Sequence, residues 1–219
     1  MDDLLKLERN VRSIYAKTLS LLARLYRFNL PSSDKDVPVS ARVLFLGNHS
    51  SGKSSFINYI AGADIQESGM APTDDGFTLI TYGEKEETFD GQTLVSHPEL
   101  DYQDLASLGP EFLAKLQFKA YPSENLRQLT LIDSPGMIDS ASSHQLRSYD
   151  FRECVRRFAE SADLVLFFFD PDKPGTTGEA VSIFTRQLVG IDHKLLIVLN
   201  KVDLFDNIRD FARTYGTLC

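Results

Sequence analysis

The chemically most suggestive stretch is glycine-rich: GNHSSGKS, at residues 47–54. It fits the phosphate-loop pattern GxxxxGK followed by Ser or Thr, in which backbone N–H groups surround phosphate oxygens. Lys53 would reach the β- and γ-phosphates of a nucleotide, and the Ser54 hydroxyl would bind Mg²⁺. The alternative is a chance glycine-rich turn. It is disfavoured because an apolar run at 42–46 precedes the segment and a helical pattern follows it.

The sequence therefore predicts a nucleoside triphosphate site. Its loop residues are expected to be Gly47, Asn48, His49, Ser50, Ser51, Gly52, Lys53, Ser54 and Ser55.

A second stretch, DSPG at 133–136, follows the apolar run LTLI and fits the DxxG pattern of P-loop GTPases. Asp133 would hold Mg²⁺ through water. Gly136 would bring its N–H to the γ-phosphate with no side chain in the way. A turn of this composition is also common by itself. Its place after a predicted strand, downstream of a phosphate loop, favours the functional interpretation.

A third stretch, NKVD at 200–203, ends the apolar run LLIVL and fits the NKxD pattern. Asp203 can accept two hydrogen bonds from guanine, at N1–H and at the exocyclic amine. Asn200 can bridge the base and the phosphate loop, and the stem of Lys201 can cover the face of the base. The alternative is a polar turn that caps a strand. The chain order of the three motifs favours a guanine site.

A threonine between the phosphate loop and DSPG is expected to sense the γ-phosphate and bind Mg²⁺. Thr73 and Thr78 both have the right position. Thr73 is favoured, because a proline before it and aspartates after it indicate a structured turn. The site prediction therefore gives catalytic roles to Lys53, Ser54, Thr73 and Gly136, and metal-binding roles to Ser54, Thr73 and Asp133. His49 and His144 have no partner spacing that supports a further metal site.

The net charge of the 219-residue chain is −8. Residues 1–30 hold six Lys/Arg and three Asp/Glu, a charge of +3, so the remainder carries −11. An acidic body argues against nucleic-acid binding. The charged N-terminus is unlike a secretory signal, no apolar run is long enough to cross a bilayer, and two isolated cysteines form no disulfide scaffold. These features favour a cytoplasmic protein.

The first 30 residues predict an amphipathic helix, with apolar residues spaced by three and four over 4–28. It could pack on its own domain or, because the stripe is long, join a helical bundle or coiled coil. A polar, proline-marked linker follows at 31–40. The nucleotide-binding domain is expected at 41–219.

Strand and helix patterns alternate along this domain, which predicts an α/β fold of the P-loop NTPase type with a mostly parallel, doubly wound sheet. The expected strands are 42–46, 77–82, 85–89 as a hairpin partner of 77–82, 126–132, and the central strands 164–169 and 195–199. Besides the helix after the phosphate loop, the expected helices are 110–118, 148–160 and 177–188.

With these motifs in view, the chain resembles the dynamin superfamily, and within it the EHD/sarcalumenin-like branch. The segments that carry the resemblance are LARLYRF, GNHSSGKSSF, APTDDGFT, LTLIDSPGMID, RSYDF with FAESADLVLFFFD, and VLNKVD. The resemblance implies a dynamin-type G domain in a nucleotidase that remodels membranes in trafficking or endocytosis. It also implies self-association through the G domain and the N-terminal helix, with peripheral membrane binding through a helical domain.

Two departures from the family pattern qualify these expectations. His49 stands where many dynamins have a glutamine that positions water, and Met137 follows DSPG, so intrinsic hydrolysis is expected to be slow and to need assembly. The chain also ends soon after NKVD, before the segments that complete the base pocket and bind membrane in relatives, so the G domain is expected to be incomplete.

The base remains open between GTP, which the chemistry of Asp203 favours, and ATP, which EHD members with the same motif use. A nucleotide-binding module without turnover and a non-enzymatic remnant of a truncated gene are the alternatives to an enzyme.

Overall fold

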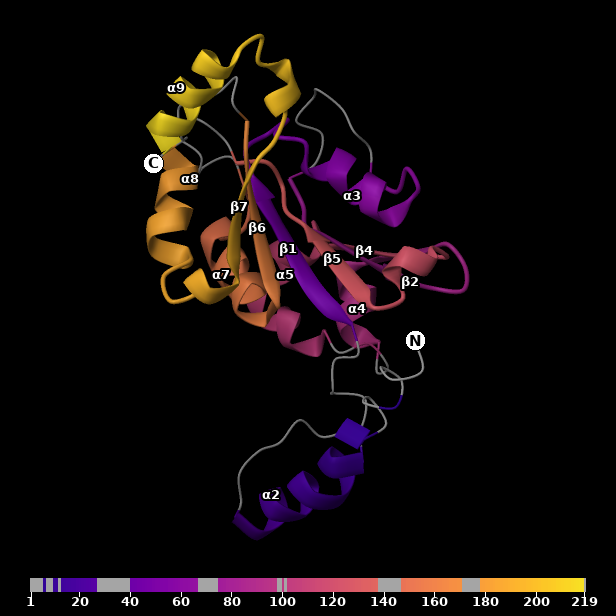
Figure 1. Cartoon of the computed structure of the whole chain (residues 1–219). Helices are drawn as coiled ribbons and strands as arrows, with labels where there is room; N and C mark the ends of the chain where they lie inside the picture. The colour runs from indigo at the N-terminus through magenta and orange to yellow at the C-terminus, as the bar shows by residue number, and fades with distance from the viewer. Residues whose placement is uncertain are drawn as a thin grey trace.

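One seven-stranded sheet organises the protein (Figure 1), in the order β3-β4-β2-β5-β1-β6-β7. The computed structural model describes residues 6, 10, 11, 13–26, 40–66, 75–97, 100, 102–137, 147–170 and 178–218. The strands are β1 Ala41–Gly47, β2 Thr78–Tyr82, β3 Glu87–Asp90, β4 Gln117–Tyr121, β5 Leu129–Asp133, β6 Leu164–Phe169 and β7 Leu195–Leu199. The α-helices are α2 Ser20–Tyr26, α3 Lys53–Ala61, α4 Gly91–Ser96, α5 Pro110–Leu113, α7 Phe151–Ser161, α8 Gly178–Ser182 and α9 Ile208–Leu218. Short π-helices are η1 Tyr15–Leu19 and η4 Ile183–Gln187, and 3₁₀-helices are η2 Gln103–Leu108, η3 Glu124–Leu126, η5 Asp192–Lys194 and η6 Val202–Leu204.

The sheet is mostly parallel, as the sequence predicts. β1 lies between β5 and β6 and is parallel to both, and β6 is parallel to β7. β2 is parallel to β4 but antiparallel to β5, and β3 is antiparallel to β4. The parallel group β5-β1-β6-β7 therefore brings the carboxyl ends of four strands to one edge of the sheet.

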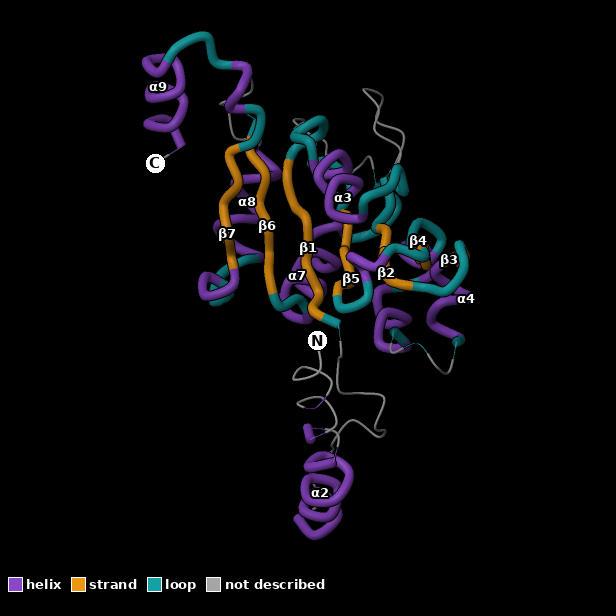
Figure 2. Tube along the Cα trace, turned by 45° about the vertical axis from the view of Figure 1, so that its right-hand side comes forward, coloured by secondary structure: helices purple, strands orange, loops and turns teal. Residues whose placement is uncertain are grey.

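Helices cover both faces of the sheet (Figure 2). Because successive side chains of a strand point to opposite faces, Leu44 and Leu46 of β1 pack into one cluster with α7, whereas Phe45 packs into another with Ile57 of α3. A strand buried on both faces must be apolar throughout, which explains the run VLFL in β1.

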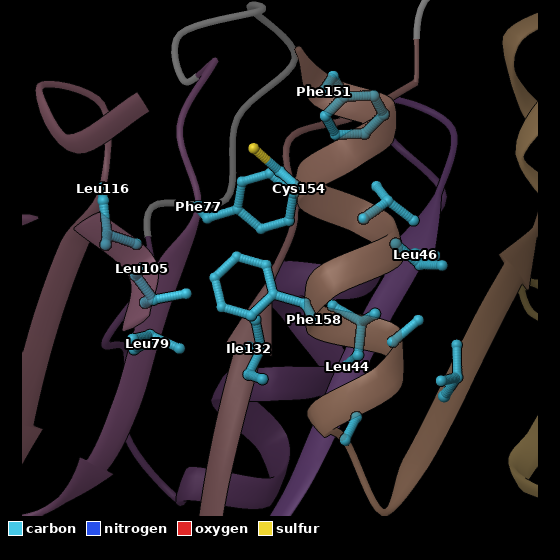
Figure 3. Close-up of a cluster of buried hydrophobic side chains, with 14 of the residues drawn as sticks. Leu44, Leu46, Phe77, Leu79, Leu105, Leu116, Ile132, Phe151, Cys154 and Phe158 are labelled. Atoms are coloured by element: carbon cyan, nitrogen blue, oxygen red, sulfur yellow. The ribbon is translucent and has the colours of Figure 1, made fainter. Parts of the chain in front are cut away.

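Aromatic rings pack among aliphatic side chains in the larger cluster (Figure 3). Phe158 of α7 faces Phe77, which directly precedes β2, with 4.9 Å between the ring centroids. Phe112 of α5 packs against the same two rings. The side chain of Asp150 caps α7 by accepting hydrogen bonds from the N–H groups of Arg152 and Glu153. These contacts fix α7 against the sheet.

Two predictions about the sheet are wrong. The segment 110–118 is not one helix, because α5 ends at Leu113 and β4 begins at Gln117. Phe118 and Ala120 alternate inward there, which is the period of a strand. The segment 85–89 does not form a hairpin with β2, because β4 occupies the place beside β2 and pairs with β3.

Three further elements differ from expectation in extent or placement. Strand β5 begins at Leu129 rather than at 126, because η3 comes first. The described part of the predicted helix 177–188 divides into α8 and the π-helix η4. β7 has the expected bounds but is an edge strand among the described residues rather than central, and Leu196 and Ile197 are each 54% exposed.

The N-terminal helix is described at 13–26, as η1 and α2, and lies apart from the sheet in Figures 1 and 2. Its apolar side chains are open to solvent: Ile14 and Leu21 are each 56% exposed and Leu25 is 67% exposed. Most of the expected linker, at 31–39, lies outside the described residues. Within the described residues, no helix is both long enough and apolar enough to span a membrane.

We expect Phe158→Ala to lower the free energy of unfolding by about 3–5 kcal/mol, because it opens a cavity among packed rings. Tyr59→Ala is the control, since Tyr59 is 82% exposed and its loss should cost no more than about 0.5 kcal/mol. Urea denaturation of both variants measures the difference. A cost for Phe158→Ala no larger than that for Tyr59→Ala would contradict the described core.

Candidate functional site

The predicted phosphate loop connects β1 to α3. β1 delivers Gly47 to the carboxyl edge of the sheet, and α3 begins at Lys53. Between them, Gly52 has φ +93, and a Cβ at this position would lie 2.1 Å from Nδ2 of Asn200. The left-handed backbone favours glycine at Gly52, and an added Cβ would push the Asn200 side chain away from Ser51. The nine-residue helix α3 has no side-chain cap at Gly52, and the first N–H groups of such a helix favour an anion.

The ammonium of Lys53 is buried within this loop. Its Nζ donates hydrogen bonds to the carbonyl oxygens of Gly47 and Asn48, each at 3.1 Å. Burial lowers the pKa of Lys53 below its usual value, and the attraction of Asp133 opposes that shift in part. A cation that has lost its water in this way gains stability from a nearby anion.

Ser54 and Asp133 lie together although they come from different motifs. The Ser54 hydroxyl donates a hydrogen bond to Oδ2 of Asp133 over 3.3 Å. Asp133 is the last residue of β5 and is level with Phe45 of the neighbouring β1. The two side chains thus offer oxygen ligands beside the phosphate loop, which is the donor type that Mg²⁺ prefers.

The DSPG segment rests directly on the phosphate loop. The Met137 N–H donates to the carbonyl of Gly47 (3.1 Å), and the His49 N–H donates to the carbonyl of Met137 (3.4 Å). A Cβ on Gly136 would lie 2.7 Å from Cα of His49. Only glycine allows this close approach at Gly136, so its backbone is brought to the loop as the motif requires.

The NKVD residues lie on the other side of the same loop. Asn200 donates from Nδ2 to the carbonyl of Ser51 (2.9 Å), which is the expected bridge to the phosphate loop. Lys201 pairs with Oδ2 of Asp170 at 2.8 Å, from the end of β6. Asp203 is exposed in η6. The structure therefore brings Asn200 to the phosphate loop and leaves the Asp203 side chain open to solvent.

The structure also describes the other residues predicted for the phosphate loop. Asn48 pairs with Met137 in an isolated bridge, and Ser51 is fully buried. The hydroxyl of Ser50 is hydrogen-bonded to Nδ1 of His49 (2.8 Å), and Ser55 is exposed on α3. Thr73 and His144 lie outside the described residues.

The alternative threonine, Thr78, is 2% exposed and begins β2 directly opposite Asp133. Among the described residues, no group of three or more His, Cys, Asp or Glu could hold a metal ion.

The structure adds polar residues that no motif marks. Gln66 donates from Nε2 to Oδ2 of Asp133 (2.7 Å) and accepts from Nζ of Lys119 (2.8 Å) at its Oε1. Asn58 on α3 fixes the main chain of Gln66, with hydrogen bonds to both its N–H and its carbonyl. These contacts orient the Asp133 carboxylate, but they join residues far apart in sequence, and so the sequence carries no pattern for them.

Comparisons with known proteins agree with this arrangement. A sequence profile of the dynamin family matches residues 43–202. The chain is 34% identical over 216 residues to EH domain-containing protein 2 of Arabidopsis thaliana. This alignment covers 95% of the present chain and 39% of the Arabidopsis protein. It is 33% identical over 214 residues to EH domain-containing protein 2 of Homo sapiens, and that alignment covers 95% of the present chain and 39% of the human protein. The chain thus spans about two fifths of the length of these curated relatives.

A solved structure also shares the fold. It is described as an oligomerised bacterial dynamin pair that provides a mechanism for long-range sensing and tethering of membranes. The TM-score is 0.58 at 18% sequence identity, over 98% of this chain and 34% of that chain. Similarity at this level of identity shows the fold alone.

We expect Gly52→Ala to destabilise the protein through both its positive φ and its contact with Asn200. Gly190→Ala is a matched control, because Gly190 has φ +82 but nothing within 4 Å of an added Cβ. The control should cost about 1 kcal/mol for the left-handed backbone, and Gly52→Ala about 1–3 kcal/mol more for the steric overlap. Equal losses in urea denaturation would mean that displacing the Asn200 side chain from Gly52 costs no stability.

Proposed function

The chain belongs to the dynamin family, and from that premise we propose that it binds a nucleoside triphosphate with Mg²⁺ and hydrolyses it slowly. The observation that carries the proposal is the joining of three sequence motifs around one loop. Asn200 is hydrogen-bonded to Ser51, Ser54 to Asp133, and the backbone of Gly136 lies on that of His49. Residues that would contact base, metal and phosphates therefore share one edge of the sheet.

The residues present fit a Mg²⁺-bound triphosphate. Lys53 provides a buried ammonium at the N-terminus of α3, where the helix favours anions. Ser54 and Asp133 would hold Mg²⁺, with Thr73 as the proposed third protein group. Mg²⁺ bound there would neutralise charge on the β- and γ-phosphate oxygens. Gly136 would donate its N–H to the γ-phosphate.

GTP is the favoured nucleotide. Asp203 would pair with the two N–H donors of guanine, and Lys201, held by Asp170, would cover the base. The alternative is ATP, since the resemblance to EHD proteins supports an ATPase equally well. Adenine offers no pair of donors to Asp203, so an ATP site would leave this carboxylate without a role in base selection.

Slow turnover follows from the side chains near the γ-phosphate. Met137 is 2% exposed and has no group that could orient water. His49 stands where many dynamins have a water-positioning glutamine, and its Nδ1 is engaged by the Ser50 hydroxyl. We infer that hydrolysis is stimulated by assembly. The same two observations support a second candidate, a nucleotide-dependent interaction module without significant turnover.

We further propose that the protein self-associates through the G domain and the N-terminal helix. We also propose that it is a cytoplasmic protein that binds membranes peripherally. The bacterial dynamin pair is described as oligomerised and as tethering membranes. In the present chain, the exposed apolar side chains of α2 support an interface. The resemblance supports a role in membrane trafficking of the endocytic type, and the acidic net charge of residues 31–219 argues against nucleic-acid binding.

We expect Lys53→Met to weaken triphosphate binding by about a hundredfold or more, because hydrogen bonds to charged groups contribute about 1.5–3 kcal/mol each. The nucleotide-free variant should be at least as stable as the wild type, since it no longer buries an ammonium. Calorimetric titration with Mg²⁺ and GTP or ATP measures binding. Lys85→Met, at an exposed lysine, is the control. Wild-type affinity in the Lys53 variant would exclude the proposed phosphate loop.

We expect Leu21→Glu with Leu25→Glu to reduce self-association, because each exposed leucine that becomes buried contributes about 1.5–3 kcal/mol. Ser13→Glu, at an exposed helical position outside the apolar stripe, adds charge without removing an apolar side chain and is the control. Sedimentation velocity over a concentration series gives the oligomeric state. A wild-type chain that stays monomeric throughout the series would refute the proposed interface of the helix.

A further inference from the structure

A buried arginine links the DSPG segment to a helix that no motif includes. Arg147 is 7% exposed. Its Nη1 pairs with Oε1 of Glu179 in α8 at 2.6 Å, and its Nη2 donates to the carbonyl of Gly136 at 2.8 Å. Its Cζ lies 3.8 Å from the ring centroid of Phe151, at the start of α7. The guanidinium thus touches three segments at once.

Stabilisation of the fold does not by itself explain why Arg147 and Glu179 form a buried ion pair. Both partners of the ion pair are only 3% exposed in their side chains, and the loss of water on burying two charges can exceed their mutual attraction. Nε of Arg147 also has no hydrogen-bond partner in the described part of the chain. Apolar residues of similar volume can fill such a space at no cost in stability. The contact that they could not replace is the one to Gly136.

Gly136 is the residue proposed above to donate its N–H to the γ-phosphate. The phosphate loop limits it on one side, where Cα of His49 leaves no room for a Cβ. Arg147 holds its carbonyl on the other side. This carbonyl belongs to the peptide group between Gly136 and Met137, whose N–H donates to Gly47. Because that peptide group is held at both of its polar atoms, Gly136 and the N–H on its other side have little freedom to move. The planar fork of arginine suits the task, because two nitrogens in fixed geometry can bind two acceptors at once.

We propose that Arg147 is a positioning residue that holds Gly136 in place to recognise the γ-phosphate, and that Glu179 orients Arg147. The inference rests on the proposed function, since it assigns the Gly136 N–H to the third phosphate of a bound triphosphate. A diphosphate has no γ-phosphate and should not depend on this contact. Arg147 therefore contributes to the preference for triphosphate over diphosphate, and α8 is tied to the phosphate-sensing segment.

The test compares Arg147→Met/Glu179→Leu with the wild type, both as the 219-residue chain. This double substitution removes both buried charges together, so that neither is left unpaired and the fold is kept. Glu124→Leu/Arg127→Met is the matched control. That pair is joined by hydrogen bonds of 2.5 and 2.9 Å but is exposed, and it lies before β5, at the opposite end from Asp133.

The readout is the affinity of each protein for GDP and for a non-hydrolysable GTP analogue, with Mg²⁺, alongside the thermal midpoint. We expect the Arg147 double variant to lose about tenfold in affinity for the GTP analogue, the effect of one hydrogen bond, and less than about twofold for GDP. The control should lose neither. Arg147→Lys, which keeps the charge without the fork, should also lose affinity for the analogue selectively.

A double variant that is folded and keeps the wild-type preference for the analogue would overturn the inference and leave the proposed function intact. Equal losses for GDP and the analogue would also overturn it, since Arg147 would then support the fold alone. A wild-type chain that binds neither these nucleotides nor ADP and a non-hydrolysable ATP analogue would refute the proposed function itself, and the inference with it.

Discussion

The parallel register of β5, β1, β6 and β7 is the constraint on which the rest of this structure depends. Asp133 at the end of β5 is level with Phe45, Gly47 is level with Phe168 in β6, and Leu199, directly before Asn200, is level with Phe169. Parallel strands present their carboxyl ends at one edge. Three motifs separated along the chain therefore meet at the phosphate loop. A shift of one residue in any pairing would turn these side chains to the opposite face.

The same edge is a place where stability and function oppose each other. Among the described residues, the buried ammonium of Lys53 donates hydrogen bonds to two carbonyl oxygens, and burial lowers its pKa. Gly52 and Gly136 lie so close to other backbone and side-chain atoms that a methyl group would not fit. A loop optimised for stability would contain neither feature. Both are explained if an anion occupies the loop in the working protein.

Local patterns predicted much of this arrangement. The three motifs and the bounds of the strands at 164–169 and 195–199 follow from short-range signals. The position of β7 does not, because it is an edge strand among the described residues rather than a central one. β4 falls within the predicted helix 110–118, because a five-residue alternation is a weak signal beside a proline that begins a helix. Gln66 and Arg147 could not be found, since their partners lie 67 and 32 residues away and only the fold brings them together.

The most direct measurement of the central claim is a calorimetric titration of the nucleotide-free chain with GTP and with ATP, each with Mg²⁺ and with excess EDTA. The arrangement of Lys53, Ser54, Asp133 and Asn200 predicts saturable one-to-one binding that weakens when Mg²⁺ is removed, with GTP bound more tightly than ATP. Tighter binding of ATP would contradict the assignment of guanine to Asp203. The absence of saturable binding by either nucleotide would contradict the site as a whole.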